Sequence, residues 1–395
     1  MHICFLSFDY PSRLGGGGVG NQAQLIGRGL VKLGMKVSVI ALVQSGLPEF
    51  EEDQGVGVYR IKPGNAHWYV SKIPFLGKIL TLPVRELEYS WAGYKKICDI
   101  NSNSTISLVE GTETGMLFVS LRMHKIHTTI RLHGERYTYA KYSPGNHLTP
   151  GIHLSRLIQR ISIRRVRSLS SPSHAHAREI SCETGIRLEN ITVLPNLIHG
   201  QLSPKHNETS PHSNNILFVG RLEEAKGVFS LIGAASEVVS LYPDTHFYLA
   251  GSQHPSLAIE VIRARIQQSN LQDHITFLGH IPHEELDQYY RNALISLLPS
   301  YYETFGVAVI EAMSYGLPVV AFSSGAIPEI IENGITGILV PPGDTHCLAQ
   351  AVVTLMRNPE LRKDMGAAAK QKVAECYDAE QPMHLFYSYY NSVIV

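Results

Sequence analysis

Cysteine is scarce and unpaired in this chain of 395 residues, which contains 5 cysteines and no Cys-x-x-Cys pair. An odd number of scattered thiols speaks against a disulfide framework. A reducing cytosol therefore fits the cysteine usage better than an oxidising compartment.

The chain also lacks a net charge, because 34 Lys and Arg residues balance 34 Asp and Glu residues. With no net field to attract a polyanion, we expect no nucleic-acid partner, and any recognition of charge must be local. Gross disorder is excluded as well, since hydrophobic residues make up 44% of the chain and charged residues 17%.

Long apolar runs are absent: none approaches the roughly 18 residues that a membrane-spanning helix needs. The apolar start from Ile3 to Phe8 turns polar at Asp9. That run is too short for a signal peptide and is typical of a first strand. We therefore expect a cytoplasmic protein, and we leave peripheral contact with the inner face of a membrane open.

The chain is longer than one hydrophobic core usually supports, so two domains of roughly 200 residues each are expected. Short runs rich in Val, Ile and Leu alternate with helical patterns, as in parallel sheets that are buried on both faces. This rhythm occurs twice, on either side of a polar stretch from His199 to Asn215 that we interpret as a linker. The predicted strands are 3–8, 37–43, 56–61, 106–109, 128–132 and 191–194, then 216–219, 245–250, 275–278, 293–298, 318–321 and 337–340.

We therefore predict an α/β protein with two Rossmann-like domains, each a mainly parallel sheet between helices. The first domain is expected over residues 1–198 and the second over 199–377. The last helical pattern, within 378–395, could pack back toward the first domain.

A run of glycines at 15–20 matches Gly-x-Gly-x-x-Gly between a predicted strand and a predicted helix. Backbone N–H groups of such a loop, those of Gly17 and Gly18 among them, can hold a phosphate at a helix N-terminus. Two alternatives are a dinucleotide-binding turn and a merely flexible turn. The former is disfavoured because residues 9–14 separate strand from glycines and no acid follows the second strand, 37–43.

The turn from Gly220 to Gly227 follows a predicted strand directly and carries Arg221 and Lys226. In open α/β sheets, ligands bind at the carboxyl ends of the strands. A guanidinium and an ammonium at that edge can both hold phosphate oxygens. The alternative interpretation is two surface cations without a ligand.

Two carboxylates, Glu303 and Glu311, are eight positions apart, one in the loop after strand 293–298 and one two turns into the next helix. Carboxylates accept hydrogen bonds from sugar hydroxyls, and Gly306 allows backbone N–H groups at the helix start to approach a ligand. The alternative, a solvated acidic pair, is disfavoured because the apolar run 307–310 indicates a buried helix start.

Together these motifs resemble the large family of retaining glycosyltransferases with the GT-B fold, the group 1 or family 4-like enzymes. The motifs that carry the resemblance are Glu303-x7-Glu311, Gly220-Arg221-x4-Lys226-Gly227, Gly316 to Ala321, Gly325 to Ile330, and the looser Gly17 to Gly20 and Leu132 to Glu135. The similarity covers essentially the whole chain. It implies two Rossmann-like domains that face each other, with the active site in the cleft between them.

The resemblance also implies a nucleoside-diphosphate sugar as co-substrate and no cofactor. Arg221 and Lys226 would bind the diphosphate, Glu311 the ribose and Glu303 the transferred sugar, which His133 would approach from the other domain. The implied catalytic residues are His133, Arg221, Lys226 and Glu303. The further implied donor contacts are Gly17, Gly18, Leu278, His280, Thr304, Phe305, Gly306, Val307 and Glu311. The acceptor, a carbohydrate or lipid-linked molecule, is expected near Glu110, Glu135, Arg136 and Tyr137.

No Asp-x-Asp occurs in the sequence, so no residues are predicted to hold a metal–diphosphate complex and we expect metal independence. Retention of anomeric configuration follows from the resemblance, with the leaving phosphate taking the acceptor proton. Two alternatives are a sugar-nucleotide-binding module without turnover and a related epimerase or phosphorylase.

A helical pattern at 153–167 places Arg156, Arg160, Arg164 and Arg167 on one face, opposite Leu154, Leu157, Ile158 and Ile161. Such a stripe could contact anionic lipid or a phosphate-bearing acceptor. The alternative, a solvated face over a packed one, is favoured. His174 and His176 resemble half of a metal site, but without partner ligands we expect a surface pair.

Overall fold

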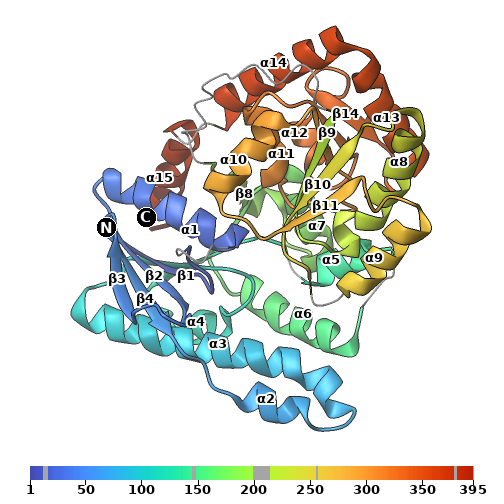
Figure 1. Cartoon of the computed structure of the whole chain (residues 1–395). Helices are drawn as coiled ribbons and strands as arrows, with labels where there is room; N and C mark the ends of the chain where they lie inside the picture. Colours follow the sequence, from blue (N-terminus) through green and yellow to red (C-terminus); the bar gives the residue numbers. More distant parts are fainter. Residues whose placement is uncertain are drawn as a thin grey trace. The chain divides into compact units, whose positions relative to one another are not determined.

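The computed structural model describes residues 1–11, 17–134, 136–144, 148–198, 214–254, 257–377 and 380–394 (Figure 1). These residues form two compact units. The first comprises Met1–Lys141, His147–Leu197 and Ala379–Val395, and the second comprises Tyr142–Asn146 and Ile198–Asp378. Residues 199–213 of the predicted linker lie outside the described part.

The first unit contains an eight-stranded sheet within the described residues. Its strands are β1 (His2–Leu6), β2 (Lys36–Leu42), β3 (Phe50–Asp53), β4 (Val56–Ile61), β5 (Leu108–Gly111), β6 (His127–Arg131), β7 (Ser168–Ser171) and β8 (Ile191–Val193). Their order is β3-β4-β2-β1-β5-β6-β7-β8, antiparallel between β3 and β4 and parallel elsewhere. Ile3 in the central strand pairs with Val37 on one side and Leu108 on the other.

Helices cover both faces of this sheet. They are α1 (Gly18–Lys32), α2 (Ala66–Ser71), α3 (Leu76–Asn103), α4 (Leu117–Arg122), α5 (Arg136–Tyr142), α6 (Pro150–Ile163), α7 (His174–Thr184), the short 3-10 helix η1 (Leu188–Asn190) and the C-terminal α15 (Glu380–Ile394). Successive residues of β1 serve opposite faces: Ile3 and Phe5 belong to the core under α1 and α15, whereas Cys4 and Leu6 belong to the other core.

The second unit contains six parallel strands within the described residues. They are β9 (Asn215–Val219), β10 (His246–Ala250), β11 (Ile275–Gly279), β12 (Ile295–Leu298), β13 (Val319–Phe322) and β14 (Gly337–Val340), in the order β11-β10-β9-β12-β13-β14. The helices are η2 (Glu224–Lys226), α8 (Val228–Leu241), α9 (Ile259–Gln268), α10 (His283–Asn292), α11 (Val307–Ser314), α12 (Ile327–Ile330), α13 (Thr345–Arg357) and α14 (Pro359–Cys376). Strand order reverses between β9 and β12, which makes their carboxyl ends the expected ligand-binding edge.

The fold class predicted from the sequence is confirmed: both sheets are mainly parallel and lie between helices. The pattern misses β3 and β7. β7 reads Ser-Leu-Ser-Ser, too polar to stand out, yet Ser170 and Ser171 are fully buried. Ser171 Oγ donates to the Ser173 carbonyl at 3.0 Å, so local hydrogen bonding offsets the burial of this hydroxyl.

Candidate functional site

The neighbouring strands β9 and β12 each end in a loop with a predicted site residue. Lys226 in the loop after β9 donates to Glu303 Oε1 in the loop after β12, at 2.7 Å. Both side chains are 13% exposed, so this ion pair is screened less by solvent than a surface pair. The structure thus brings together a residue predicted to bind phosphate and a residue predicted to bind the sugar.

Backbone contacts fasten these two loops to each other. Gly227 has φ +73°, and a Cβ there would lie 1.8 Å from the Pro299 carbonyl oxygen, so a side chain cannot be accommodated. The Tyr301 N–H donates to the Ala225 carbonyl at 2.9 Å. Glu303 is held in turn by the Ala326 N–H, which donates to its carbonyl at 2.9 Å.

Arg221 is more exposed than Lys226. Its side chain is 48% exposed and forms an ion pair with Glu223 at 2.8 Å, and His254 Nδ1 lies 3.5 Å from the same carboxylate. The sequence pattern does not identify Glu223 as a site residue. Its buried carboxylate orients the guanidinium at the end of β9.

Helix α11 begins beside Glu303. Its N-cap is Gly306, with φ +98°, where a Cβ would lie 2.7 Å from Ile327 Cδ1. Thr304 and Phe305 are buried beneath the turn. The first N–H groups of an α-helix have no partner within the helix and carry partial positive charge, which suits an anionic or hydroxyl-bearing ligand.

Glu311 lies at the start of the second turn of α11, in a different environment from Glu303. Tyr290 Oη donates to Glu311 Oε2 at 3.1 Å, and the Tyr290 ring stacks on Tyr315 with centroids 4.8 Å apart. Burial raises the pKa of Glu311 above its usual value, although Tyr290 and His283 oppose the shift.

The remaining predicted donor contacts of this unit lie at the end of β11. Leu278 is half-buried and His280 is exposed. Leu278 packs against the core that contains Val309 and Phe305.

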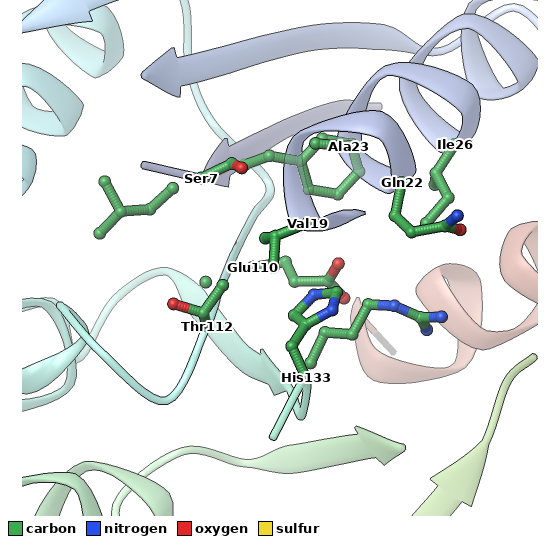
Figure 2. A pocket seen from close by; sticks show the side chains of 12 residues that line it. Ser7, Val19, Gln22, Ala23, Ile26, Glu110, Thr112 and His133 are labelled. Atoms are coloured by element: carbon green, nitrogen blue, oxygen red, sulfur yellow. The ribbon is translucent and has the colours of Figure 1, made fainter. Parts of the chain in front are cut away.

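A small pocket lies in the first unit, where the carboxyl ends of β1, β5 and β6 meet the start of α1 (Figure 2). Its volume is about 20 Å³, roughly the room that one water molecule needs. Figure 2 shows the side chains of Glu110 and His133 on one side of it and those of Val19 and Ala23 on the other. The lining residues are Phe5, Leu6, Ser7, Val19, Gln22, Ala23, Ile26, Glu110, Gly111, Thr112, Arg131 and His133.

Glu110 belongs to a buried polar network rather than to an open acceptor surface. It is 5% exposed and accepts from Tyr390 Oη of α15 at 3.0 Å. Burial raises the pKa of Glu110 to about 7, against the opposing effects of Arg131 and Tyr390. Its Oε2 has no hydrogen-bond partner among the described residues.

Arg131 is the second charged member of this network, and the sequence pattern does not single it out. It is 2% exposed, and its Nη2 donates to the Leu194 carbonyl at 3.0 Å and to Asn196 Oδ1 at 2.9 Å. Its guanidinium lies over the Phe386 ring of α15, 4.8 Å from the centroid. Within the described residues, Nε and Nη1 have no hydrogen-bond partner, so Arg131 has donors left at the pocket wall.

His133 follows β6 and is fixed through its backbone. The carboxylate of buried Glu113 accepts from the N–H groups of His133 and Gly134, at 2.7 and 3.1 Å. Burial and the charge of Arg131 lower the pKa of His133 to about 3, so the imidazole is neutral near pH 7.

The expectation of a surface histidine pair is wrong for His176. Its side chain is fully buried, and Nε2 lies 4.0 Å from Glu113 Oε1. His174 is exposed, as expected. Within the described part of the chain, no group of three or more His, Cys, Asp or Glu residues is arranged to hold a metal ion.

The glycine loop is described only in part. Gly15 and Gly16 lie outside the described residues, Gly17 is the N-cap of α1, and α1 begins at Gly18. The Gly17 N–H donates to the Asp9 carboxylate, so a phosphate would compete with Asp9 for this donor.

The predicted acceptor residues are also described only in part. Glu135 and the side chain of Arg136 lie outside the description. Tyr137 is half-buried beneath the guanidinium of Arg156, which lies 3.6 Å from its ring centroid.

The arginine stripe of α6 is largely tied to the protein. Arg156 pairs with Glu183 at 2.8 Å, and Arg164 donates to the Thr184 carbonyl at 2.7 Å. Leu157 and Ile161 are 54% and 38% exposed. The expectation that the apolar side of this helix packs inward is therefore wrong at these two positions, because α6 turns other residues, including Ser155 and Gln159, toward α3.

Both halves of the chain match described protein families. Residues 202–372 match the glycosyl transferases group 1, and residues 17–197 match the glycosyl transferase 4-like domain. The glycogen synthase of Mycobacterium tuberculosis is 32% identical over 221 residues, which are 55% of this chain and 52% of that protein. The chain thus spans about half the length of the first curated relatives that it matches.

Solved structures extend the similarity to the whole chain. Sucrose-phosphate synthase from Thermosynechococcus elongatus has a TM-score of 0.81 at 21% identity, over 100% of this chain and 99% of that one. HepE from Anabaena, in complex with UDP-glucose, has a TM-score of 0.75 at 17% identity, over 99% and 100%. At these identities the likeness establishes the GT-B fold. The two family matches on this fold show that the chain belongs to the group 1 glycosyltransferases.

Proposed function

We propose that this protein is a retaining, metal-independent glycosyltransferase that moves a sugar from a nucleoside-diphosphate sugar to a hydroxyl acceptor. The observation that carries the proposal is the Lys226–Glu303 pair at the edge where strand order reverses, 2.7 Å between Nζ and Oε1. It places a cation and a hydrogen-bond acceptor for sugar hydroxyls beside the N-terminus of α11.

The proposed chemistry is departure of the nucleoside diphosphate. The bond between the anomeric carbon and the phosphate oxygen breaks, the acceptor oxygen bonds to the same face, and the leaving phosphate takes the acceptor proton. Negative charge grows on the diphosphate, where Lys226, Arg221 and the N–H groups of the α11 start would stabilise it. Removal of one such contact costs roughly 10²–10³ in rate in comparable sites.

Each remaining residue has a role in the proposal. Glu311 would bind the ribose, Glu303 the transferred sugar, and Leu278 with His280 would lie near the base. Neutral His133 would contact the sugar as a hydrogen-bonding group rather than as a cation, since its pKa is lowered to about 3. The burial of Glu110 favours a supporting role in the pocket wall over direct contact with the acceptor.

The donor and acceptor classes are also part of the proposal. HepE was solved with UDP-glucose, so UDP-sugars are the first donors to test. The acceptor is proposed to be a carbohydrate or a lipid-linked molecule. The cysteine usage supports the proposed cytoplasmic location. Peripheral contact at the inner face of a membrane is a separate part of the proposal. Within the described residues, no helix has the length and apolar character required to cross a membrane.

The deciding experiment measures nucleoside-diphosphate release from a panel of sugar nucleotides, with and without candidate acceptors and in EDTA. Release that depends on acceptor, with the anomeric configuration of the product retained by NMR, is the expected result. Binding of sugar nucleotide without any turnover would favour the alternative of a non-catalytic binding module. Conversion of the sugar without transfer would favour an epimerase.

A further inference from the structure

Helix α2, the first residue of α3 and the turn between them expose large apolar side chains. Trp68, Tyr69, Ile73, Phe75 and Leu76 are 54%, 67%, 46%, 85% and 49% exposed. All five fall within residues 68–76, which we call the aromatic tip. Soluble proteins rarely expose clustered apolar side chains without an interaction that uses them. None of the proposed chemistry involves this segment.

The aromatic tip is held in place by hydrogen bonds. The carboxylate of Glu88 in α3 accepts from the Ala66 N–H at 2.5 Å and lies 2.5 Å from His67 Nδ1, which fastens α2 to α3. The Gly77 N–H donates to the Ile73 carbonyl at 2.8 Å and closes the turn.

Phe75 occupies the strained position of this turn. Its φ is +59°, a conformation that bulky residues rarely adopt. This strained position carries the most exposed aromatic ring of the tip. Packing of so exposed a ring does not account for the strain, and a functional role of the ring explains it better.

Cations outnumber carboxylates around the aromatic tip, where Glu88 contributes one carboxylate that is 12% exposed and bonded to Ala66 and His67. Residues 62–85 contain Lys62, Lys72, Lys78 and Arg85 and no Asp or Glu, although the chain as a whole is balanced at 34 against 34. The first three of these cations are exposed. Lys72 Nζ lies 5.0 Å from the Trp68 ring centroid, so cation and aromatic ring point to the same surface.

Helix α6, which packs beside α3, also lacks acidic residues and exposes apolar side chains. Its N-terminal turn is tightly packed there, since a Cβ on Gly151 would lie 2.9 Å from the carbonyl oxygens of both Lys78 and Ile79. Residues 148–167 also lack Asp and Glu, and Leu157 and Ile161 of this stretch are exposed.

We propose that the aromatic tip, residues 68–76 with the flanking lysines, docks the protein peripherally on an anionic lipid bilayer. Trp and Tyr favour the level of the lipid headgroups, and Phe, Ile and Leu favour the acyl boundary beneath it. Lysines that flank an inserted apolar segment are attracted to anionic headgroups. Charge complementarity selects the partner: two copies of the tip would bring like charges together, whereas an anionic bilayer accepts both the rings and the ammonium groups.

Vesicle flotation tests this proposal without any assay of transfer, so its failure is separable from failure of the proposed function. The probes are vesicles of phosphatidylcholine alone and of equal parts phosphatidylcholine and phosphatidylglycerol. The wild-type protein is expected to float with the anionic vesicles only, and less at high salt. In a Trp91→Phe variant the remaining Trp68 should shift its fluorescence to the blue when the anionic vesicles are added.

Two tip variants and one control locate the surface. Trp68→Ser with Phe75→Gly removes both rings, and Gly tolerates the positive φ at position 75. Lys72→Glu with Lys78→Glu reverses the charge. Each pair should lower affinity for anionic vesicles at least tenfold. The control Leu241→Ser with Ile335→Ser removes side chains of similar exposure, 51% and 57%, from the second unit.

Normal binding by both tip variants, or no binding of the wild-type protein to anionic vesicles, would overturn the proposal. So would a dimer in solution that only the tip variants abolish, because the tip would then be a contact between copies. Turnover of a water-soluble acceptor should be the same in the tip variants and the wild-type protein.

Discussion

The two units hold their charged residues in opposite ways. In the second unit, Lys226 and Glu303 come from the loops after adjacent strands and remain 13% exposed. In the first unit, Glu110 and Arg131 are 5% and 2% exposed and contact side chains of α15, a helix at the far end of the chain. Because the Lys226–Glu303 pair is partly exposed, a ligand can reach it and replace one partner. The Glu110 and Arg131 side chains are covered by α15, which suits them to support the pocket wall. In the proposed function, Lys226 and Glu303 of the second unit contact the donor, whereas Glu110 and Arg131 of the first unit support the pocket wall.

The largest expected effect tests the chemical side of this contrast. Lys226→Ala should lower kcat roughly 10²–10³-fold, because the cation meets charge that grows as the diphosphate leaves. Arg221→Ala should lower it less, since this side chain is 48% exposed and paired with Glu223. Steady-state kinetics with a sugar nucleotide measures both.

The matched control is Lys372→Ala, which breaks a Lys–Glu pair of the same 2.7 Å length with Glu332, outside the proposed site. Near wild-type rates are expected for the control. If Lys226→Ala behaved like the control, the loop pair would be structural and the contrast between the units would disappear.

The second prediction concerns the buried side of the contrast. Burial raises the pKa of Glu110 from 4.5 to about 7, so the folded state binds a proton that the unfolded state releases. The stability that Glu110 contributes is full below pH 4.5 and is lost as pH rises through about 7. Relative to Glu110→Gln, the wild-type protein should lose up to about 3 kcal/mol over this window.

Thermal unfolding of both proteins at a series of pH values tests this sign. The melting temperature of the wild-type protein should fall relative to that of Glu110→Gln as pH rises from 4.5 to about 7. Parallel curves for the two proteins would mean that Glu110 ionises normally and that the network is not closed to solvent.

A third prediction sharpens the contrast within the second unit. Glu303 pairs with Lys226 beside the proposed sugar, so Glu303→Gln should mainly lower kcat, by about tenfold or more. Glu311 accepts from Tyr290 deeper in the protein, and Glu311→Gln should mainly weaken binding of donor and of free nucleoside diphosphate. Calorimetric titration with nucleoside diphosphate separates the two. Loss of nucleotide affinity in Glu303→Gln alone would reverse the assignment.

The smallest expected effect is that of metal removal. We expect turnover to survive EDTA, because Lys226 and Arg221 can supply the charge that a cation would otherwise bring to the diphosphate. Activity lost in EDTA and restored by Mg²⁺ or Mn²⁺ would contradict this prediction.

The sequence is most informative where the site is local. Two parallel sheets follow from the alternation of apolar runs and helical patterns, and the strands that precede Lys226 and Glu303 place each residue at the carboxyl edge of the sheet, although their ion pair is not predicted. The network around Arg131 is not predictable in this way. Its partners Leu194, Asn196 and Phe386 are distant in the chain, and no local spacing marks them. His176 is misjudged for the same reason, since its neighbour Glu113 belongs to another element.

Helix α15 has a consequence for synthesis of the chain on the ribosome. It supplies Met383, Phe386, Tyr389 and Tyr390 to the core that also contains Ile3 and Phe5 of β1. Until α15 has been translated, that core lacks part of its covering and buried Arg131 lacks its aromatic neighbour. The second unit is contiguous from residue 214 to 377 apart from a short piece near residue 142. The first unit therefore begins first in translation, but its core can be completed only after the second unit has been translated and α15 has followed it.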